Sequence, residues 1–146
     1  MENEKVLEVD NLHVSFQTYA GEVKAVRGVS FELKKGETLA FVGESGCGKS
    51  TFGRTLLRLT EATSGEILYC GENILTFGRQ KMKQMRKNMQ IIFQDPYASV
   101  DPRKSVVEII AEYMLIHHTY PTRREIFNRA AQLMDIVGLA RRTANS

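Results

Sequence analysis

A glycine-rich segment constrains the fold of this chain more than any other feature of its sequence. Residues 43–50, Gly-Glu-Ser-Gly-Cys-Gly-Lys-Ser, match the pattern G-x-x-x-x-G-K-[S/T]. Residues 38–42 before it are apolar after the first, and they predict a central strand buried on both faces. Residues 49–59 after it repeat apolar side chains at helical spacing. A strand, a glycine loop and a helix in this order are typical of a phosphate-binding loop.

The glycines of this segment have a mechanical purpose. Backbone N–H groups can wrap a triphosphate only where the chain curls with φ values that side chains oppose, and Gly43, Gly46 and Gly48 remove that opposition. The following helix directs its unpaired N–H groups and the positive end of its dipole at the phosphates. We therefore predict a site for a triphosphate. Its residues are Gly43, Glu44, Ser45, Gly46, Cys47, Gly48, Lys49, Ser50 and Thr51.

The first residues of the predicted helix have separate expected roles. Lys49 is placed to reach the β- and γ-phosphates, the Ser50 hydroxyl to ligate Mg²⁺, and the Thr51 amide to hold the α-phosphate. A G-x-G-x-x-G loop of the dinucleotide or protein-kinase type is not supported, because Thr51 stands where the third glycine is required. A glycine-rich turn with an incidental lysine is the simplest alternative, and the strand and helix around the loop argue against it.

Composition and charge exclude several other classes of protein. A net charge of +3 is too small to predict nucleic-acid binding, and the basic run at 79–87 lacks interleaved aromatic residues, so it is interpreted as a solvated helix face. The apolar fragments are far shorter than the roughly 20 residues of a membrane span, and the first residues lack the features of a secretory leader. Cys47 and Cys70 lack the spacing of a zinc site or a disulfide framework. We therefore expect a reduced, cytoplasmic protein.

Apolar periodicity predicts further strands on both sides of the loop. Residues 6–14 and 29–33 alternate between apolar and polar side chains, as expected of half-exposed antiparallel strands at the edge or cover of a sheet. Residues 65–69 and 72–76 give a weaker signal for a strand pair. Residues 89–93 predict a second buried strand, which ends at Gln94.

Capping residues predict two helices in the C-terminal part of the chain. Ser105 with Glu108 and Thr122 with Glu125 are each spaced as a capping box, and Gly138 ends the second helix. Each helix keeps an apolar face. We therefore expect the two helices to pair.

Several segments resemble, in order and spacing, the ATP-binding subunits of ATP-binding cassette (ABC) transporters. Besides residues 43–51, they are residues 24–31, 35–39 and 63–67. Residues 91–103, Ile-Ile-Phe-Gln-Asp-Pro-Tyr-Ala-Ser-Val-Asp-Pro-Arg, are similar to the Q-loop of the oligopeptide, dipeptide and nickel importer branch. The resemblance covers residues 7–139.

This resemblance implies an α/β fold, namely a P-loop NTPase with a truncated ABC ATPase core. Residues 1–94 would form an N-terminal antiparallel β subdomain with the P-loop core up to the Q-loop, and residues 95–146 the Q-loop and the beginning of the helical subdomain. Gln94 would be the Q-loop glutamine, which meets Mg²⁺ and the attacking water and acts in catalysis with Lys49. Tyr19 is the first candidate for the aromatic residue that stacks on adenine, and Phe16 is the second.

The function implied by the resemblance is that of an importer ATPase. Such a subunit lies at the cytoplasmic face of the membrane and couples ATP binding and hydrolysis to uptake of oligopeptides, dipeptides or a related solute. Its expected partners are a second ATPase subunit in a head-to-tail dimer, two membrane permease subunits and, indirectly, an extracytoplasmic solute-binding protein. No nucleic-acid partner is expected.

Three features of that family do not occur in this sequence. It has no SGGQ-like signature, no apolar strand that ends in Asp-Glu as a Walker B pair, and no histidine at a switch position after such a strand. We therefore expect residues 1–146 to retain only the binding half of the reaction. Because strands that should flank residues 38–42 are missing, we also expect marginal folding and aggregation. The alternatives are a truncated nucleotide-binding module without turnover and a soluble ABC ATPase of repair or translation.

Overall fold

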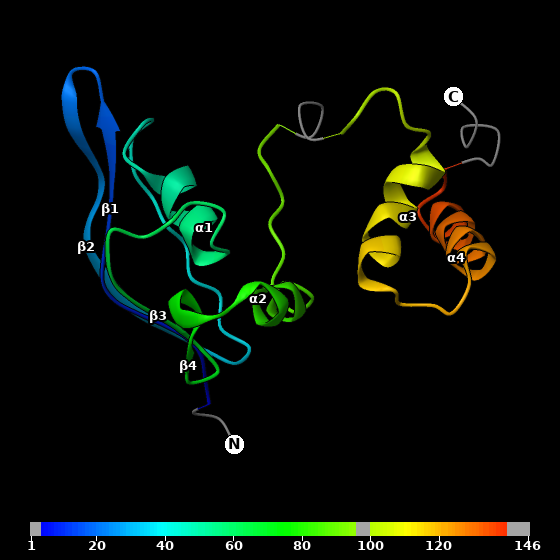
Figure 1. Ribbon diagram of the computed structural model, residues 1–146, viewed down its shortest axis with the longest axis horizontal. Coiled ribbons are helices and arrows are strands. Elements are labelled where there is room, and N and C mark those ends of the chain that lie inside the picture. The colour runs from blue at the N-terminus through cyan, green and yellow to red at the C-terminus, as the bar shows by residue number, and fades with distance from the viewer. Residues whose placement is uncertain (1–3, 96–99, 140–146) are drawn as a thin grey trace. The chain divides into compact units, whose positions relative to one another are not determined.

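The chain folds into two units, which are described separately. The computed structural model describes residues 4–95 and 100–139, and its units are Met1–Ile91 and Ile92–Ser146 (Figure 1). Residues 96–99 of the Q-loop segment lie outside the described residues. The elements of the first unit are β1 (Lys5–Thr18), β2 (Gly21–Lys34), α1 (Lys49–Leu56), β3 (Ser64–Tyr69), β4 (Glu72–Asn73), the 3₁₀ helix η1 (Ile74–Thr76) and α2 (Arg79–Met85). Those of the second are α3 (Val106–His117) and α4 (Arg123–Ile136).

An antiparallel sheet of order β2-β1-β3-β4 is the framework of the first unit. This confirms the predicted antiparallel strands and the weak strand pair, although the second of that pair is only two residues long and continues as η1. The expected edge position is correct for β2 but wrong for β1, which lies between β2 and β3. Strand alternation alone gives this wrong assignment, because a central antiparallel strand with one face in solvent alternates as an edge strand does.

A bulge in β1 changes which of its residues face the core. Leu7 and Val9 are buried before the bulge, and Leu12 and Val14 are buried after it. Asn11, at the bulge, has φ 43, and a Cβ built on Gly65 of β3 would lie only 2.5 Å from the Asn11 carbonyl oxygen. Glycine at position 65, with φ +99, therefore lets β3 pair with the bulged strand.

The core of the first unit lies between the sheet and the helices α1 and α2. Phe52 of α1 packs edge-on against Phe31 of β2, with ring centroids 5.7 Å apart, and lies 4.8 Å from the Phe41 ring. The buried core residues are Leu7, Val9, Leu12, Val14, Val26, Phe52, Ile67, Ile74, Met82 and Met85. Both helices are therefore attached to one face of the sheet.

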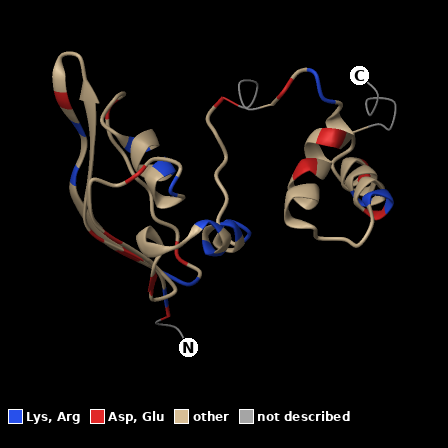
Figure 2. Ribbon diagram, in the orientation of Figure 1, with Lys and Arg blue, Asp and Glu red and all other residues tan. Residues whose placement is uncertain are grey.

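The basic run around α2 is only partly the solvated face that was expected. Figure 2 shows Lys and Arg concentrated on this helix. Lys81 is exposed and forms an ion pair with Glu72. Arg86, the residue after the helix, is only half-exposed and donates hydrogen bonds to backbone carbonyl groups at the end of α1. The interpretation of the run as solvated is therefore wrong for Arg86.

Two buried strands that the sequence predicts are not formed. Neither residues 38–42 nor residues 89–93 are strands, and Val42 and Ile92 are 95% and 97% exposed. In the described parts of the chain, no strand pairs with either segment. An apolar run becomes a strand only when its N–H and C=O groups form hydrogen bonds with a neighbouring strand. The strands of this sheet pair with one another instead.

The second unit is a pair of helices with the predicted capping boxes and the predicted stop at Gly138. At the start of α3, the Glu108 carboxylate accepts a hydrogen bond from the Ser105 N–H at 2.9 Å, which lowers the pKa of Glu108. At the start of α4, the Glu125 N–H donates to Thr122 Oγ1 and the Glu125 carboxylate accepts from the Thr122 N–H, at 3.2 and 3.1 Å. Gly138, with φ 75, follows the end of α4. The buried residues between the helices are Ala111, Met114, Ile126 and Ala130.

Replacing Gly65 by alanine should destabilise the first unit by at least about 2 kcal/mol, because the new methyl group would strike the backbone of β1 and φ would remain positive. The matched control is Gly78→Ala, where no atom lies within 4 Å of a Cβ placed on the glycine and φ is −70. We expect that control to change stability by less than about 1 kcal/mol. Urea denaturation followed by circular dichroism measures both, and equal effects would contradict the bulge argument.

The exposed apolar side chains of Val42 and Ile92 predict that the purified chain binds a hydrophobic dye and self-associates. Exposed apolar side chains provide a surface on which a dye or a second copy of the chain can bind. Ile92→Lys should reduce the light scattering of concentrated samples, because a charge opposes contact between copies. A sharp, reversible melt of a monomer that binds no dye would be inconsistent with this expectation.

Candidate nucleotide-binding site

The predicted binding residues 43–51 follow residues 38–42 and include the first turn of α1, which begins at Lys49. The loop turns tightly, with the Cys47 N–H 3.4 Å from the Glu44 carbonyl oxygen. Residues 43–47, Lys49 and Ser50 are exposed, and Gly48 is half-buried. The loop is therefore open to a ligand on one side and supported on the other.

The three positions of the loop that hold glycine require it for different structural reasons. Gly46 and Gly48 have φ values of +81 and +95, as expected of residues whose backbone conformation opposes a side chain. Gly43 is not among the glycines with positive φ, so the expectation is wrong for this residue. Position 43 requires glycine because a side chain would not fit there: a Cβ would lie 2.7 Å from Cys47 Sγ.

Gly48 seats the end of the loop on the sheet. A Cβ built on it would lie 2.2 Å from the Ala25 carbonyl oxygen of β2. Only glycine allows this approach, and the next residue, Lys49, is the first of α1. The position of α1 is thus set relative to β2 at the point where the helix begins. Sequence reasoning did not single out Ala25, since nothing local distinguishes it from other strand residues.

The Lys49 ammonium group lies within the curl of the loop. Its Nζ donates to the carbonyl oxygens of Gly43 and Glu44, both at 2.6 Å, and lies 3.3 Å from Cys47 Sγ. An ammonium group has three donors and binds anionic oxygens more strongly than neutral carbonyl oxygens. The side chain can therefore transfer these donors to a phosphate group that enters the loop.

The first turn of α1 has the features of an anion site. The Phe52 N–H donates to Gly48 O at 2.8 Å, whereas the N–H groups of Lys49, Ser50 and Thr51 precede the first intrahelical hydrogen bond. No acidic residue lies in this turn, so no carboxylate competes for the positive end of the helix dipole. Backbone donors, the helix dipole and the Lys49 cation therefore act on the same space.

The donors around this loop also fit a magnesium nucleotide. Mg²⁺ is commonly held in proteins by one or two oxygen ligands together with phosphate oxygens and water, and Ser50 supplies an exposed hydroxyl group beside Lys49. Among residues 4–95 and 100–139, no group of three or more His, Cys, Asp and Glu side chains could hold a metal ion. Ser50 is therefore the candidate protein ligand in this loop.

The two candidate adenine-stacking residues lie on the hairpin of β1 and β2. Tyr19 is in the connecting turn, and its side chain is fully exposed. Phe16 is 41% exposed and pairs with Val23 of β2. Val23 is two residues from Ala25, the residue that Gly48 contacts, whereas the turn with Tyr19 is further along the chain. Both remain candidates, and the strand register favours Phe16.

Gln94 belongs to the second unit, so the structure does not group it with residues 43–51. Its side chain is exposed. Further along the same segment, the Asp101 carboxylate accepts hydrogen bonds from the Arg103 side chain and backbone, and these bonds lower the pKa of Asp101.

Gly48→Ala should lower the affinity for a fluorescent ATP analogue at least about tenfold, because it adds both backbone strain and a collision with Ala25 O. The matched control is Gly53→Ala, which lies within α1. Gly53 has no atom within 4 Å of the built Cβ and no positive φ, so alanine should leave affinity unchanged and raise stability by up to about 1 kcal/mol. Equal loss of affinity in both variants would show that the contact with β2 does not shape the loop.

Comparisons with known proteins agree with this geometry. The family model described as ABC transporter matches residues 26–146. The chain is 50% identical over 143 residues to the oligopeptide transport ATP-binding protein OppF of Bacillus subtilis, covering 97% of this chain and 47% of that protein. It is 47% identical over 144 residues to the dipeptide transport ATP-binding protein DppD of Lactococcus lactis, covering 95% and 41%. The chain therefore spans less than half the length of these relatives.

Solved structures give the same fold. The chain aligns with the ATP-binding cassette MJ0796 bound to ADP and Pi, in a dimeric post-hydrolysis state, at a TM-score of 0.76 and 21% identity, covering 95% of this chain and 60% of that one. It aligns with cbiO1 of Clostridium perfringens at a TM-score of 0.67 and 24% identity, covering 95% and 52%. At these identities the likeness shows an ABC ATPase core as the fold. Together with the family match over most of its length, this shows that the chain belongs to the ABC transporter family.

Proposed function

We propose that this chain is the ATP-binding part of an ABC importer ATPase. The observation that supports this best is the position of the Lys49 ammonium group, which lies in a glycine curl at the N-terminus of α1 and is held by neutral oxygens of Gly43 and Glu44. A Mg²⁺-bound triphosphate is the ligand whose charge and size suit this arrangement.

Each residue of the loop would have a defined task. The amides of residues 44–48 would surround the β-phosphate, the Thr51 amide would hold the α-phosphate, and Lys49 would bind β- and γ-phosphate oxygens. Ser50 would ligate Mg²⁺, and Phe16 or Tyr19 would stack on adenine. Gln94 would complete the site by contacting Mg²⁺ and orienting the attacking water in the intact subunit.

Solute uptake would follow from hydrolysis in a larger assembly. The named relatives are oligopeptide and dipeptide transport proteins, so we propose peptides or a related solute as the cargo. The intact subunit would pair head to tail with a second ATPase subunit, contact two permease subunits and act indirectly with a solute-binding protein. We place it peripherally at the cytoplasmic face of the membrane. Among the described helices, none is long and apolar enough to cross a bilayer.

We propose different roles for the N-terminal and C-terminal parts of the chain. Residues 1–94 would supply the β subdomain and the nucleotide-binding core, and residues 95–146 the Q-loop with the start of the helical subdomain. Because the sequence contains no signature segment and no Walker B pair, we propose that residues 1–146 bind nucleotide without turning it over.

Lys49→Ala should remove most of the nucleotide affinity, with Kd rising at least about a hundredfold, because a charge-assisted contact to the phosphates is lost. The matched control is Lys83→Ala, which removes an exposed cation from α2 outside the loop. Titration with a fluorescent ATP analogue in the presence of Mg²⁺ measures both. Unchanged binding by Lys49→Ala would refute the proposed site.

Phosphate release distinguishes a binding module from an ATPase. We expect the purified chain to release no more phosphate from ATP than its Lys49→Ala variant, since no Walker B glutamate is present to orient water. A steady-state assay with a coupled phosphate sensor measures this. Release that saturates with ATP and disappears in Lys49→Ala would show that residues 1–146 are catalytically competent.

A further inference from the structure

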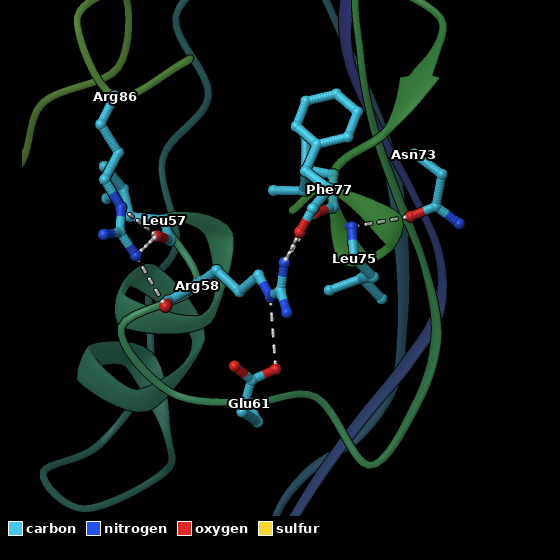
Figure 3. Close-up of polar contacts among 8 residues, drawn as sticks. Leu57, Arg58, Glu61, Asn73, Leu75, Phe77 and Arg86 are labelled. Atoms are coloured by element: carbon cyan, nitrogen blue, oxygen red, sulfur yellow. Dashed lines mark hydrogen bonds and ion pairs between the residues drawn. The ribbon is translucent and has the colours of Figure 1, made fainter. Parts of the chain in front are cut away.

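The end of the phosphate-loop helix is held by an arginine from another element. The Arg86 guanidinium group follows α2, and it donates from Nε and Nη2 to Leu57 O at 3.1 and 3.0 Å and from Nη2 to Arg58 O at 2.9 Å (Figure 3). The last carbonyl groups of a helix lack intrahelical partners and form the negative end of its dipole. Leu57 is the C-cap residue of α1, so the guanidinium group supplies a donor and a positive charge to one of these carbonyl groups and also binds the next carbonyl group along the chain.

Arg58 makes the reciprocal connection. It has φ 53, an uncommon conformation for a residue with a side chain, and it closes the helix with hydrogen bonds from Arg58 N to Thr55 O and from Leu59 N to Arg54 O, both 2.9 Å. Glycine is the usual residue at such a position. The arginine side chain instead donates to Phe77 O at 2.6 Å and to Glu61 Oε2 at 3.4 Å (Figure 3). It also donates to Ile74 O at 3.4 Å.

These two arginines form a clamp, which we define as Arg58 and Arg86. Arg86 extends from the end of α2 to the backbone of α1, and Arg58 extends from the end of α1 to the backbone between η1 and α2. At the other end of α1, Gly48 rests on Ala25. The helix that carries Lys49 and the loop amides is thus fixed at both ends.

We propose that Arg86, with Arg58, is a positioning residue for the nucleotide site. It contacts no ligand and acts through α1, whose orientation sets the direction of the first-turn N–H groups and of Lys49. An eight-residue helix is about 12 Å long, so a shift of about 2 Å at its C-terminal end, with the helix pivoting on the Gly48 contact, tilts it by about 10° and moves the tip of a long first-turn side chain such as Lys49 by about 1 Å. Groups that bind a ligand such as phosphate must be held within about 0.5 Å of their productive positions. This inference rests on the proposed function.

Binding affinities of matched variants test the proposal in the 146-residue chain. At a temperature where circular dichroism shows each variant folded, Arg86→Ala should weaken binding of a fluorescent Mg-ATP analogue about tenfold. Arg86→Lys should lose less, because an ammonium group retains the charge but not the fork. Lys83→Ala, which removes a cation from α2, should bind within about twofold of the unmodified chain.

Arg58→Gly separates positioning from simple stability. Glycine relieves the strain of φ 53 and favours this helix end, so the local backbone should form at least as well. The clamp contact to Phe77 O is nevertheless lost. We expect a roughly three- to tenfold weaker Kd for the analogue. Arg58→Gly that binds as tightly as the unmodified chain would overturn the proposal, as would an Arg86→Ala variant with a lower Tm and unaltered affinity.

Hydrogen exchange tests the clamp without nucleotide. The Phe52 N–H, bonded to Gly48 O at the start of α1, should exchange faster in Arg86→Ala if the clamp controls the first turn. Faster exchange confined to residues 57–59 would show that the effect stays local and would overturn the inference. If the unmodified chain shows no binding that Lys49→Ala removes, the proposed function fails on its own, and the exchange of Phe52 still decides whether the clamp reaches the loop.

Discussion

The close approach of Gly48 to the Ala25 carbonyl group is the constraint on which the candidate site depends. It fixes the start of α1 on β2, at a distance that no side chain at position 48 would permit. Three features of the loop lie next to this contact. The curl of residues 43–47 ends there, the Lys49 ammonium group is returned into the curl, and the first-turn amides face outward from a fixed helix.

The contact between Gly48 and Ala25 also requires a sheet on which α1 can pack. The bulge at Asn11 changes the alternation of β1, so that Leu12 and Val14 face the core that Phe52 also enters. Gly65 allows β3 to pair across the bulge. Apolar burial on this face then holds α1 and α2 against the sheet, and the aromatic contacts among Phe31, Phe41 and Phe52 place the middle of α1.

Features determined by neighbouring residues were predictable from the sequence. The phosphate-binding pattern, the capping boxes of Ser105 and Thr122 and the stop at Gly138 each depend on residues within a few positions of one another. The alternation of residues 6–14 and 29–33 likewise predicts two antiparallel strands, although the strands formed are longer, Lys5–Thr18 and Gly21–Lys34.

Features that depend on distant partners were not predictable in this way. Residues 38–42 and 89–93 are apolar enough for strands, but pairing decides strand formation, and no strand pairs with them in the described residues. Arg86 reads as one cation of a basic run, and only the position of the Leu57 and Arg58 carbonyl groups distinguishes it. The space requirement of Gly43 likewise depends on where Cys47 Sγ lies.

Calorimetric titration of the folded chain with Mg-ATP tests the central claim most directly. The account predicts a saturable heat of binding with one site per chain, because the loop, the Lys49 cation and the first turn of α1 form a single anion site. A flat titration, on material that circular dichroism shows to be folded, would contradict it.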